Sequence, residues 1–318
     1  MPHSLAALPV LSLAAPRADF ARDIGASFRR FGFALVADHG IDAALIAEGW
    51  RLTEAFFALP EAEKRRWHVP GIGGARGYTP FRTEIAKGAS AHDLKEFWHV
   101  GRDLADSEYA AGTALAASMP RNLWPDAPAH FADTFRALYA AFDAAGARIL
   151  AAIALDLGLA EDWFAPAIDQ GNSVLRLLHY PPIAGASCGA IRAGAHEDIN
   201  LITLLLGAEE AGLELLTKQG EWQEVAPPPG ALVINIGDML QRLTNHVLPS
   251  TTHRVRNPDA ARAAHSRYSM PFFLHLRSDF AFHTLPQCIT PENPDRYPVS
   301  ITADDYLQER LREIGLTK

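Results

Sequence analysis

The second half of the chain consists of short apolar stretches separated by glycine and proline, and this pattern restricts the fold more than any other feature. After residue 172 we predict seven strands, at residues 173–180, 199–205, 213–216, 222–225, 231–236, 251–256 and 268–276. Many short strands with turn residues between them are typical of a β-sandwich or a β-barrel. A mainly β core is therefore expected.

The first half of the chain is predicted to mix helices and strands. Apolar side chains recur with the helical period at residues 19–30, 41–59, 61–67 and 129–157, and strands are predicted at residues 8–13, 31–40, 77–84 and 93–100. Asp19 stands where a helix N-cap is expected, and a last helix is predicted at residues 303–314. Because residues 120–128 are rich in proline, we divide the chain there. Residues 1–126 form an α+β N-terminal region, and residues 127–318 hold the long helix, the β core and the C-terminal helix.

The composition excludes several classes of protein. Hydrophobic residues make up 48% of the 318 residues and charged ones 21%, as in soluble globular proteins. A net charge of −8 without a basic cluster argues against a nucleic-acid partner. No uninterrupted apolar run has the length of a membrane span, and the N-terminus lacks the features of a signal peptide. The two cysteines, Cys188 and Cys288, are interpreted as free thiols in a reducing compartment, so we expect a cytoplasmic protein.

Three side chains of the β-rich half have metal-ligand chemistry. His196 and Asp198 are two residues apart, and on an extended chain such side chains point to the same side, whereas Glu197 points away. His253 lies on another predicted strand and completes a set of two imidazoles and one carboxylate. Such a set leaves three adjacent coordination positions open on a metal, which non-haem Fe(II) oxygen chemistry requires. His39, with no such partner nearby, is interpreted as structural.

A second pair at the same spacing points to an anion. Arg267 and Ser269 are again two residues apart, so both are expected on one side of a strand, inside the core. A buried guanidinium is costly unless it is paired. A carboxylate of a small ligand, bound through two parallel hydrogen bonds, is a natural partner.

The order of these motifs resembles that of the isopenicillin N synthase-like Fe(II)/2-oxoglutarate-dependent oxygenases. The resemblance spans nearly the whole chain. It includes residues 8–40, Arg76-Gly-Tyr-Thr-Pro-Phe, residues 93–101, Leu175-Arg-Leu-Leu-His-Tyr180-Pro and Asn235-Ile-Gly-Asp238, all in the expected order. The sequence departs from the family pattern at Leu178, where plant relatives commonly have Asn, and at His246, where Gly is common.

The resemblance implies an α+β fold whose mainly β core is a double-stranded β-helix (jelly roll) flanked by helices. It implies that His196, Asp198 and His253 bind Fe(II). It also implies that Arg267 and Ser269, helped by the Tyr180 hydroxyl, bind the distal carboxylate of 2-oxoglutarate. The implied reaction consumes O2, releases succinate and CO2, and oxidises a C–H bond of a small molecule, most simply by hydroxylation. Desaturation and ring closure stay open, as does the oligomeric state.

Four cations are candidates for the substrate pocket: Arg76, Arg82, Lys95 and Arg176. Together they would favour an anionic substrate, although each of them fits a solvated surface charge equally well. Two other functions also remain open. One is an Fe(II) oxidase of the same fold that does not use 2-oxoglutarate. The other is a jelly-roll metal-binding or sensor protein without turnover.

Overall fold

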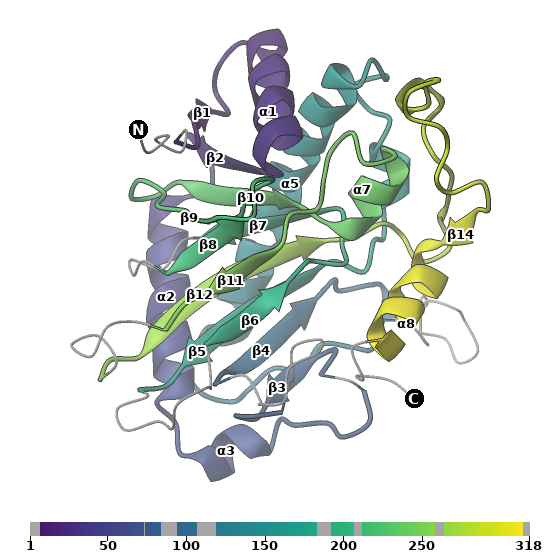
Figure 1. Ribbon diagram of the computed structural model, residues 1–318. Helices are drawn as coiled ribbons and strands as arrows, with labels where there is room; N and C mark the ends of the chain where they lie inside the picture. Colours follow the sequence, from purple (N-terminus) through teal and green to yellow (C-terminus); the bar gives the residue numbers. More distant parts are fainter. Residues whose placement is uncertain are drawn as a thin grey trace.

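The structure is a computed structural model that describes residues 7–72, 74–83, 94–106, 119–182, 192–206, 212–257 and 264–313. Its core is a jelly roll made of a large and a small sheet, with helices behind the large sheet (Figure 1). The large sheet has eight strands in the order β1-β2-β10-β7-β12-β5-β4-β3. These strands are β1 Val10–Ser12, β2 Phe33–Ala37, β3 Gly77–Thr79, β4 Glu96–Gly101, β5 Val174–Tyr180, β7 Ile202–Leu206, β10 Leu232–Ile236 and β12 Arg267–Leu274.

The small sheet has four strands in the order β6-β11-β8-β9. Its strands are β6 Ala193–His196, β8 Leu213–Leu216, β9 Trp222–Glu224 and β11 His253–Val255. Leu213 and Leu215 of this sheet pack with Phe33 and Leu35 of the large sheet, so the two sheets share a buried apolar contact. The structure thereby confirms the mainly β core.

The helices are α1 Arg17–Phe31, α2 Ala43–Phe57, α3 Glu61–Arg65, α5 Phe131–Asp156, α6 Ala165–Ile168, α7 Asp238–Leu243 and α8 Ala303–Glu313. A short 3-10 helix, Pro286–Cys288, and a two-stranded sheet of β13 Ala281–Phe282 and β14 Ile301–Thr302 precede α8. Cys288 is buried with a free thiol, and Cys188 lies outside the described residues.

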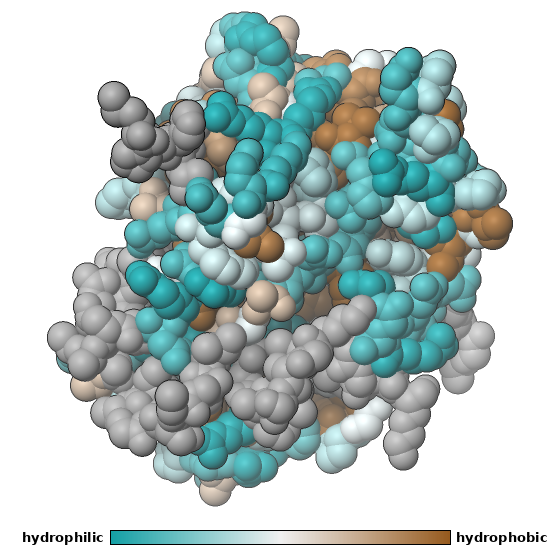
Figure 2. Space-filling view, viewed as in Figure 1, coloured by the Kyte–Doolittle hydropathy of each residue, from teal (hydrophilic) through white to brown (hydrophobic). Residues whose placement is uncertain are grey.

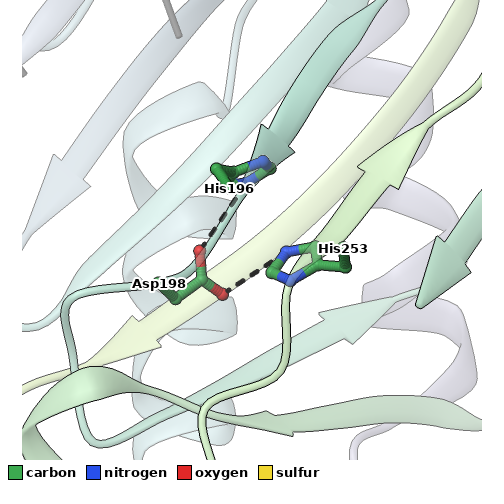
Figure 3. A group of neighbouring side chains, drawn as sticks. All are labelled: His196, Asp198 and His253. Carbon is green, nitrogen blue, oxygen red and sulfur yellow. Dashed lines mark ion pairs between the residues drawn. The ribbon is translucent and has the colours of Figure 1, made fainter. Parts of the chain in front are cut away.

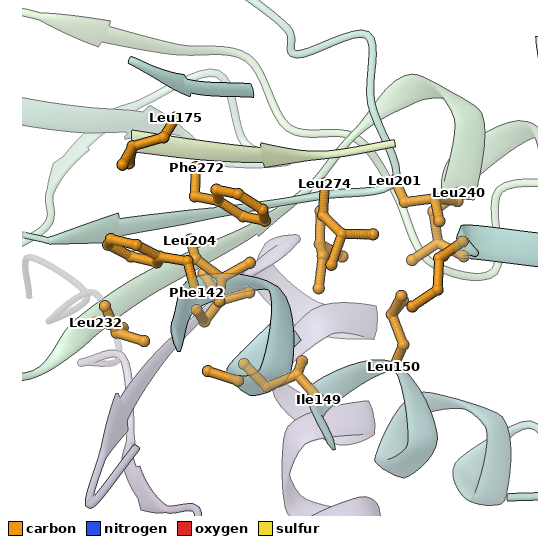
Figure 4. Close-up of a cluster of buried hydrophobic side chains, with 14 of the residues drawn as sticks. Phe142, Ile149, Leu150, Leu175, Leu201, Leu204, Leu232, Leu240, Phe272 and Leu274 are labelled. Atoms are coloured by element: carbon orange, nitrogen blue, oxygen red, sulfur yellow. The ribbon is translucent and has the colours of Figure 1, made fainter. Parts of the chain in front are cut away.

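The main apolar core lies between the large sheet and the helices. Alternate residues of the central strands, including Leu204, Phe272 and Leu274, face α5 (Figure 4). The ring of Phe272 stacks on that of Phe142, with centroids 5.5 Å apart and planes at 9°. α5 approaches this closely because Gly146 has no side chain; a Cβ there would lie 2.4 Å from Cδ1 of Leu274. The opposite faces of the same strands are consequently free to line the space between the two sheets.

α5 is also the one helix of the described residues that is long and apolar enough to cross a membrane, by length and composition alone. Its most apolar stretch has a mean hydropathy of 1.5, but 56% of that stretch is buried within the protein. Its apolar residues therefore pack in the main core, against the large sheet. The face of the molecule seen in Figure 2 is mainly hydrophilic, with apolar side chains in small separate patches.

Several expectations from the sequence need correction. Asp19 is not an N-cap: Pro16 occupies that position, and Asp19 lies in the first turn, paired with Arg22 at 2.8 Å. Residues 199–201 form a bend before β7, and the strand β6 was not predicted. The Ala-Gly-Ala segment of β6 has no apolar alternation, and it is extended because it pairs with β11. The helices α6 and α7 and the strands β13 and β14 were missed because each is too short to show a period.

The remaining predicted helices and strands are confirmed, with ends that shift by a few residues. Residues 84, 93 and 314, at the ends of three of them, lie outside the described residues. The division at residue 126 stays a prediction. β1 to β4 nevertheless belong to the same sheet as β5, β7, β10 and β12.

The two faces of β12 give a prediction about stability. Phe272→Ala should lower the free energy of unfolding by about 3–5 kcal/mol, because it leaves a cavity against α5. Phe273→Ala should cost less, because that ring is only partly buried and faces the other way. Urea unfolding of both variants, compared with the unchanged protein, measures the two losses. Equal losses would contradict the assignment of the two faces.

Candidate functional site

His196, Asp198 and His253 meet at the junction of the two sheets, as the sequence predicts. His196 ends β6 and pairs across the sheet with His253, the first residue of β11. Asp198 lies in the segment that connects β6 to β7 (Figure 3). One carboxylate oxygen lies 3.9 Å from Nε2 of His196 and the other 3.9 Å from Nε2 of His253. All three ligating atoms are within 4.8 Å of one another.

Backbone carbonyls fix the orientation of both imidazoles. Nδ1 of His196 lies 2.7 Å from the carbonyl oxygen of Gly194, and Nδ1 of His253 lies 3.1 Å from that of Thr251. A carbonyl oxygen only accepts, so each Nδ1 carries a proton and donates it, and each Nε2 of a neutral ring keeps a lone pair. Metal-binding histidines are oriented in this way in many proteins. The ring of Phe33 packs edge-on against His253 at 5.5 Å and supports it from the large sheet.

The Asp198 carboxylate is held from the inner face of the large sheet. Its Oδ2 accepts hydrogen bonds from the Thr203 hydroxyl at 2.5 Å and from the Asn235 amide at 2.8 Å. Burial alone would raise the pKa of Asp198. The nearby His253 and His196 and these two hydrogen bonds outweigh burial, so the pKa lies below its usual value. Asp198 is therefore a carboxylate at neutral pH.

The donor set fits a divalent first-row metal. Removal from water, followed by the neighbouring His253, lowers the pKa of His196, although its side chain remains 39% exposed. Its ring is thus neutral at pH 7, the form in which imidazole binds a metal. Two imidazole nitrogens and one carboxylate, all on one side, suit Fe(II) and leave the other side open. Glu197 is exposed and accepts a hydrogen bond from Thr252 at 2.7 Å, so it points away, as expected.

Arg267, Ser269 and Tyr180 are brought together on the inner face of the large sheet. Arg267 and Ser269 are 4% and 3% exposed and lie on the same side of β12. Arg267 is paired with Tyr180 across β12 and β5, and its guanidinium carbon lies 5.1 Å from the centre of the tyrosine ring. The expected geometry of this trio is therefore present.

Arg176 lies on β5 four residues before Tyr180, so its side chain is on the same inner face. Its Nε donates to Nε2 of His99 at 2.5 Å, and its guanidinium lies 4.3 Å from the ring of Phe97 and 5.1 Å from that of Phe273. Phe97 also packs with Leu178 and Tyr180 in a small buried cluster. A cation between aromatic walls thus lies in the space between the sheets.

The other three candidate cations have different surroundings. Arg76 is 2% exposed and donates to the carbonyl of Ala75 and the side chain of Asn172. It occupies the space that a side chain at Gly101 would take, since a Cβ there would lie 1.9 Å from its Cζ. Arg76 therefore braces the end of β4. Arg82 is exposed in a turn beside Phe81. Lys95 is half-buried, and its charge contributes to lowering the pKa of His196.

The structure also explains the two departures from the family pattern. Leu178 belongs to the apolar wall beside Phe97. His246 has a φ of 66°, the left-handed conformation for which glycine is the usual choice. Its Nε2 lies 2.6 Å from the Tyr297 hydroxyl, and the two rings stack, which offsets the strain of that conformation. His39 is structural as predicted, with Nε2 2.8 Å from the Gly230 carbonyl.

The sequence analysis missed several polar residues around the site: Thr203, His99, Arg192 and His275. Thr203 and His99 face inward because they pair across the sheet with Phe273 and Arg176, which lie on the inner face. Arg192 is 1% exposed and donates to the carbonyl of His265. Burial lowers the pKa of His275 to about 4, partly countered by the charge of Asp198. His275 continues the odd-numbered series of Arg267 and Ser269, so alternation alone would have indicated it.

Two family models match the chain. Residues 8–127 match the N-terminal region of the non-haem dioxygenases described for morphine synthesis, and residues 171–276 match the 2OG-Fe(II) oxygenase superfamily. A 2-oxoglutarate-Fe(II) type oxidoreductase of Emericella nidulans is 32% identical over 307 residues, covering 94% of this chain and 86% of that protein.

Solved structures agree. A putative 2OG-Fe(II) oxygenase family protein from Caulobacter crescentus is 52% identical, with a TM-score of 0.89 over 98% of this chain and 100% of that one. A full-length Neurospora crassa protein, solved in a complex with α-ketoglutarate and thymine, is 25% identical, with a TM-score of 0.83 and 96% of each chain covered. With relatives this similar along almost its whole length, the chain belongs to the 2OG-Fe(II) oxygenase superfamily and is an oxidoreductase that uses Fe(II), 2-oxoglutarate and O2.

Proposed function

We propose that His196, Asp198 and His253 bind Fe(II), that Arg267, Ser269 and Tyr180 bind the distal carboxylate of 2-oxoglutarate, and that the protein hydroxylates a C–H bond of a small acidic molecule. The observation that carries this proposal is the convergence of three ligating atoms within 4.8 Å, from both sheets. When bound, iron with 2-oxoglutarate and O2 supplies the oxidant for the C–H bond, with release of succinate and CO2.

The metal ligands are prepared for binding by their hydrogen bonds. The carbonyls of Gly194 and Thr251 hold both Nδ1 protons, so Nε2 of each ring faces the metal position. Thr203 and Asn235 occupy Oδ2 of Asp198, which leaves Oδ1 for the metal. The protein ligands carry one negative charge, so the Fe(II) site has a net positive charge that attracts the chelating end of a 2-oxo acid.

Arg267 provides the charge and shape that the far end of 2-oxoglutarate needs. A guanidinium donates two parallel hydrogen bonds to a carboxylate, and in a buried position this pair is shielded from water. The Ser269 and Tyr180 hydroxyls lie on the same inner face and add hydrogen-bond donors for the distal carboxylate. The co-substrate is thereby held at both ends and in one orientation.

The substrate class follows from the surroundings of Arg176. Its cation lies between Phe97 and Phe273, and Leu178 continues the apolar wall. These surroundings suit a molecule with an apolar or aromatic body and one acidic group. The complex of the Neurospora crassa relative contains thymine, a small molecule, which supports a small substrate for this chain as well. Arg76 braces the end of β4, and Arg82 is exposed in a turn. Of the four candidate cations, Arg176 and Lys95 are therefore the ones that contact the substrate.

The first prediction concerns the metal. His196→Ala, Asp198→Ala and His253→Ala should each lower Fe(II) affinity by more than about 100-fold, because even the loss of an outer partner of a ligand costs 10–100-fold. Glu197→Ala should keep the affinity, since that side chain is exposed and points away. Anaerobic equilibrium dialysis with metal analysis measures the four affinities. Loss of iron from Glu197→Ala with retention by Asp198→Ala would refute the ligand set.

The second prediction concerns 2-oxoglutarate. Arg267→Leu leaves a buried carboxylate without its partner, which costs about 3–5 kcal/mol, or two to four orders of magnitude in affinity. Arg267→Lys keeps the charge but loses the planar two-pronged contact, so its affinity should fall in between. Anaerobic titration of the Fe(II) protein follows the visible charge-transfer band of the chelate. A wild-type protein that shows no band, with oxygen uptake indifferent to 2-oxoglutarate, would favour the oxidase alternative.

The third prediction concerns the substrate. Across a panel of small acids, Arg176→Gln should raise the KM of the accepted substrate at least tenfold, a loss of about 1.4 kcal/mol. Arg82→Gln is the matched control, because that guanidinium is exposed. Oxygen uptake in the presence of 2-oxoglutarate measures both. If the best substrate is uncharged and its KM is the same in both variants, the acidic substrate class is wrong.

A further inference from the structure

Behind the Arg267–Tyr180 pair, on the side of the large sheet that faces the helices, lies a buried polar network. Glu96 of β4 is its centre and is 4% exposed. Its carboxylate accepts hydrogen bonds from Nζ of Lys64 at 2.8 and 2.9 Å, from Nδ1 of His179 at 2.7 Å, and from the Tyr78 hydroxyl. None of these side chains contributes to the metal-binding set or to the proposed binding of 2-oxoglutarate.

The charge of Glu96 decides the direction of the hydrogen bonds around it. Burial raises its pKa, but hydrogen bonds from His179, Lys64 and Tyr78 and the charge of Lys64 outweigh burial, so Glu96 is ionised at neutral pH. A carboxylate only accepts, so Nδ1 of His179 must donate. In the neutral ring Nε2 then accepts, and the Ser266 hydroxyl lies 3.0 Å from it.

His179 in turn holds both chain neighbours of Arg267. Ser266 hydrogen-bonds to the ring, and Tyr268 stacks on it with centroids 4.8 Å apart and planes at 13°. Tyr268 is also the cross-strand partner of His179, as Arg267 is of Tyr180. The residues on either side of Arg267 are thus held on the helix-facing side, and strand alternation directs Arg267 into the space between the sheets.

The N-terminal part of the chain closes the network from behind. Lys64 of α3 contacts Glu96 and also donates to the backbone carbonyl of Phe57 at 3.2 Å. Phe57, the last residue of α2, packs against the rings of His179 and Tyr268 at 5.2 and 6.5 Å. The position of β12 at Arg267 therefore depends on a cation that lies on the opposite side of the sheet.

We infer that Glu96 and His179, with Lys64, are positioning residues for Arg267 and so set the affinity for the distal carboxylate of 2-oxoglutarate. This inference rests on the proposed function of Arg267. Glu96 and His179 touch neither co-substrate nor metal, and they act through the backbone of β12. The network accordingly raises the affinity for 2-oxo acids that carry a second carboxylate and has little effect on the affinity for those that do not.

The experiment compares two 2-oxo acids on the full-length Fe(II) protein without oxygen. 2-Oxoglutarate has a distal carboxylate, whereas 2-oxobutyrate has the same chelating end and none. The charge-transfer band gives a Kd for each 2-oxo acid. The Kd of 2-oxobutyrate divided by the Kd of 2-oxoglutarate isolates the contribution of the distal carboxylate. Glu96→Gln should weaken 2-oxoglutarate at least tenfold and change the Kd of 2-oxobutyrate less than threefold. Lys64→Met should act in the same direction, and Lys64→Arg should restore the wild-type ratio.

Glu214→Gln is the matched control for breaking a buried charge pair. Glu214 of the small sheet has an 11% exposed side chain and pairs with Arg254 at 2.7 Å. Its loss should lower the melting temperature as Glu96→Gln does, but it should leave the ratio of the two Kd values unchanged. Ser266→Ala removes the hydroxyl at the end of the network, which lies beside Nε2 of His179. It should lower the ratio about threefold to tenfold even if Glu96→Gln does not fold.

The outcomes separate the inference from the function on which it rests. If Arg267→Leu leaves the ratio of Kd values unchanged, the proposed role of Arg267 is wrong. If Arg267→Leu abolishes the preference for 2-oxoglutarate, but Glu96→Gln or, where that variant does not fold, Ser266→Ala retains it, only the positioning role is overturned. An equal loss for both 2-oxo acids would also overturn it, because general loosening of the site does not depend on the distal carboxylate.

Discussion

The arrangement of the site depends on the short connection between β6 and β7, where the chain leaves the small sheet after His196, passes Asp198 and enters the large sheet. His196 is fixed by its pairing with His253 in the small sheet. Asp198 is fixed by hydrogen bonds from Thr203 and Asn235, which are paired with each other in the large sheet. The distances between the three ligating atoms are therefore set by how the two sheets pack. The apolar contact of Phe33 and Leu35 with Leu213 and Leu215 is thus part of the metal site's support.

The large sheet has two faces with different tasks. Leu204, Phe272 and Leu274 on one face bury apolar surface against α5, which stabilises the fold. The other face carries Asn235, Arg267 and Arg176, whose burial costs free energy unless hydrogen bonds and charged ligands compensate for it. The apolar burial on the helix-facing side stabilises the sheet, so the sheet tolerates this cost on its inner face. The period of two along each strand keeps the two functions apart, so a residue and its chain neighbour respond to substitution in different ways.

Local spacing was sufficient to predict which candidate side chains lie on the same side, but not their setting. Side chains two residues apart share a side on any extended chain, so the common direction of Arg267 and Ser269 and the outward direction of Glu197 followed once these segments were predicted to be extended. β6 did not, because its Ala-Gly-Ala segment becomes a strand only through pairing with β11. Asp19 has the chemistry of a cap, yet the helix begins two residues earlier, after Pro16. Arg76 was a candidate for binding the substrate. Only a tertiary feature identifies it as a brace: its guanidinium fills the space that a side chain at Gly101 would take.

The N-terminal region matches a family model of its own, yet it does not form a separate unit around the site. β2 and β4 are strands of the large sheet, so Phe33 supports His253 and Phe97 lines the space around Arg176. α2 and α3 lie behind β12 and contribute Phe57 and Lys64 to the buried network of Glu96. The proposed ligands of metal and co-substrate come from the second half of the chain, and both halves hold them in place: Thr203 and Asn235 from the second half, and Phe33 and Lys64 from the first. Changes in the N-terminal region should therefore act on affinity and specificity even where they touch no ligand, because the same sheet transmits them to the inner face.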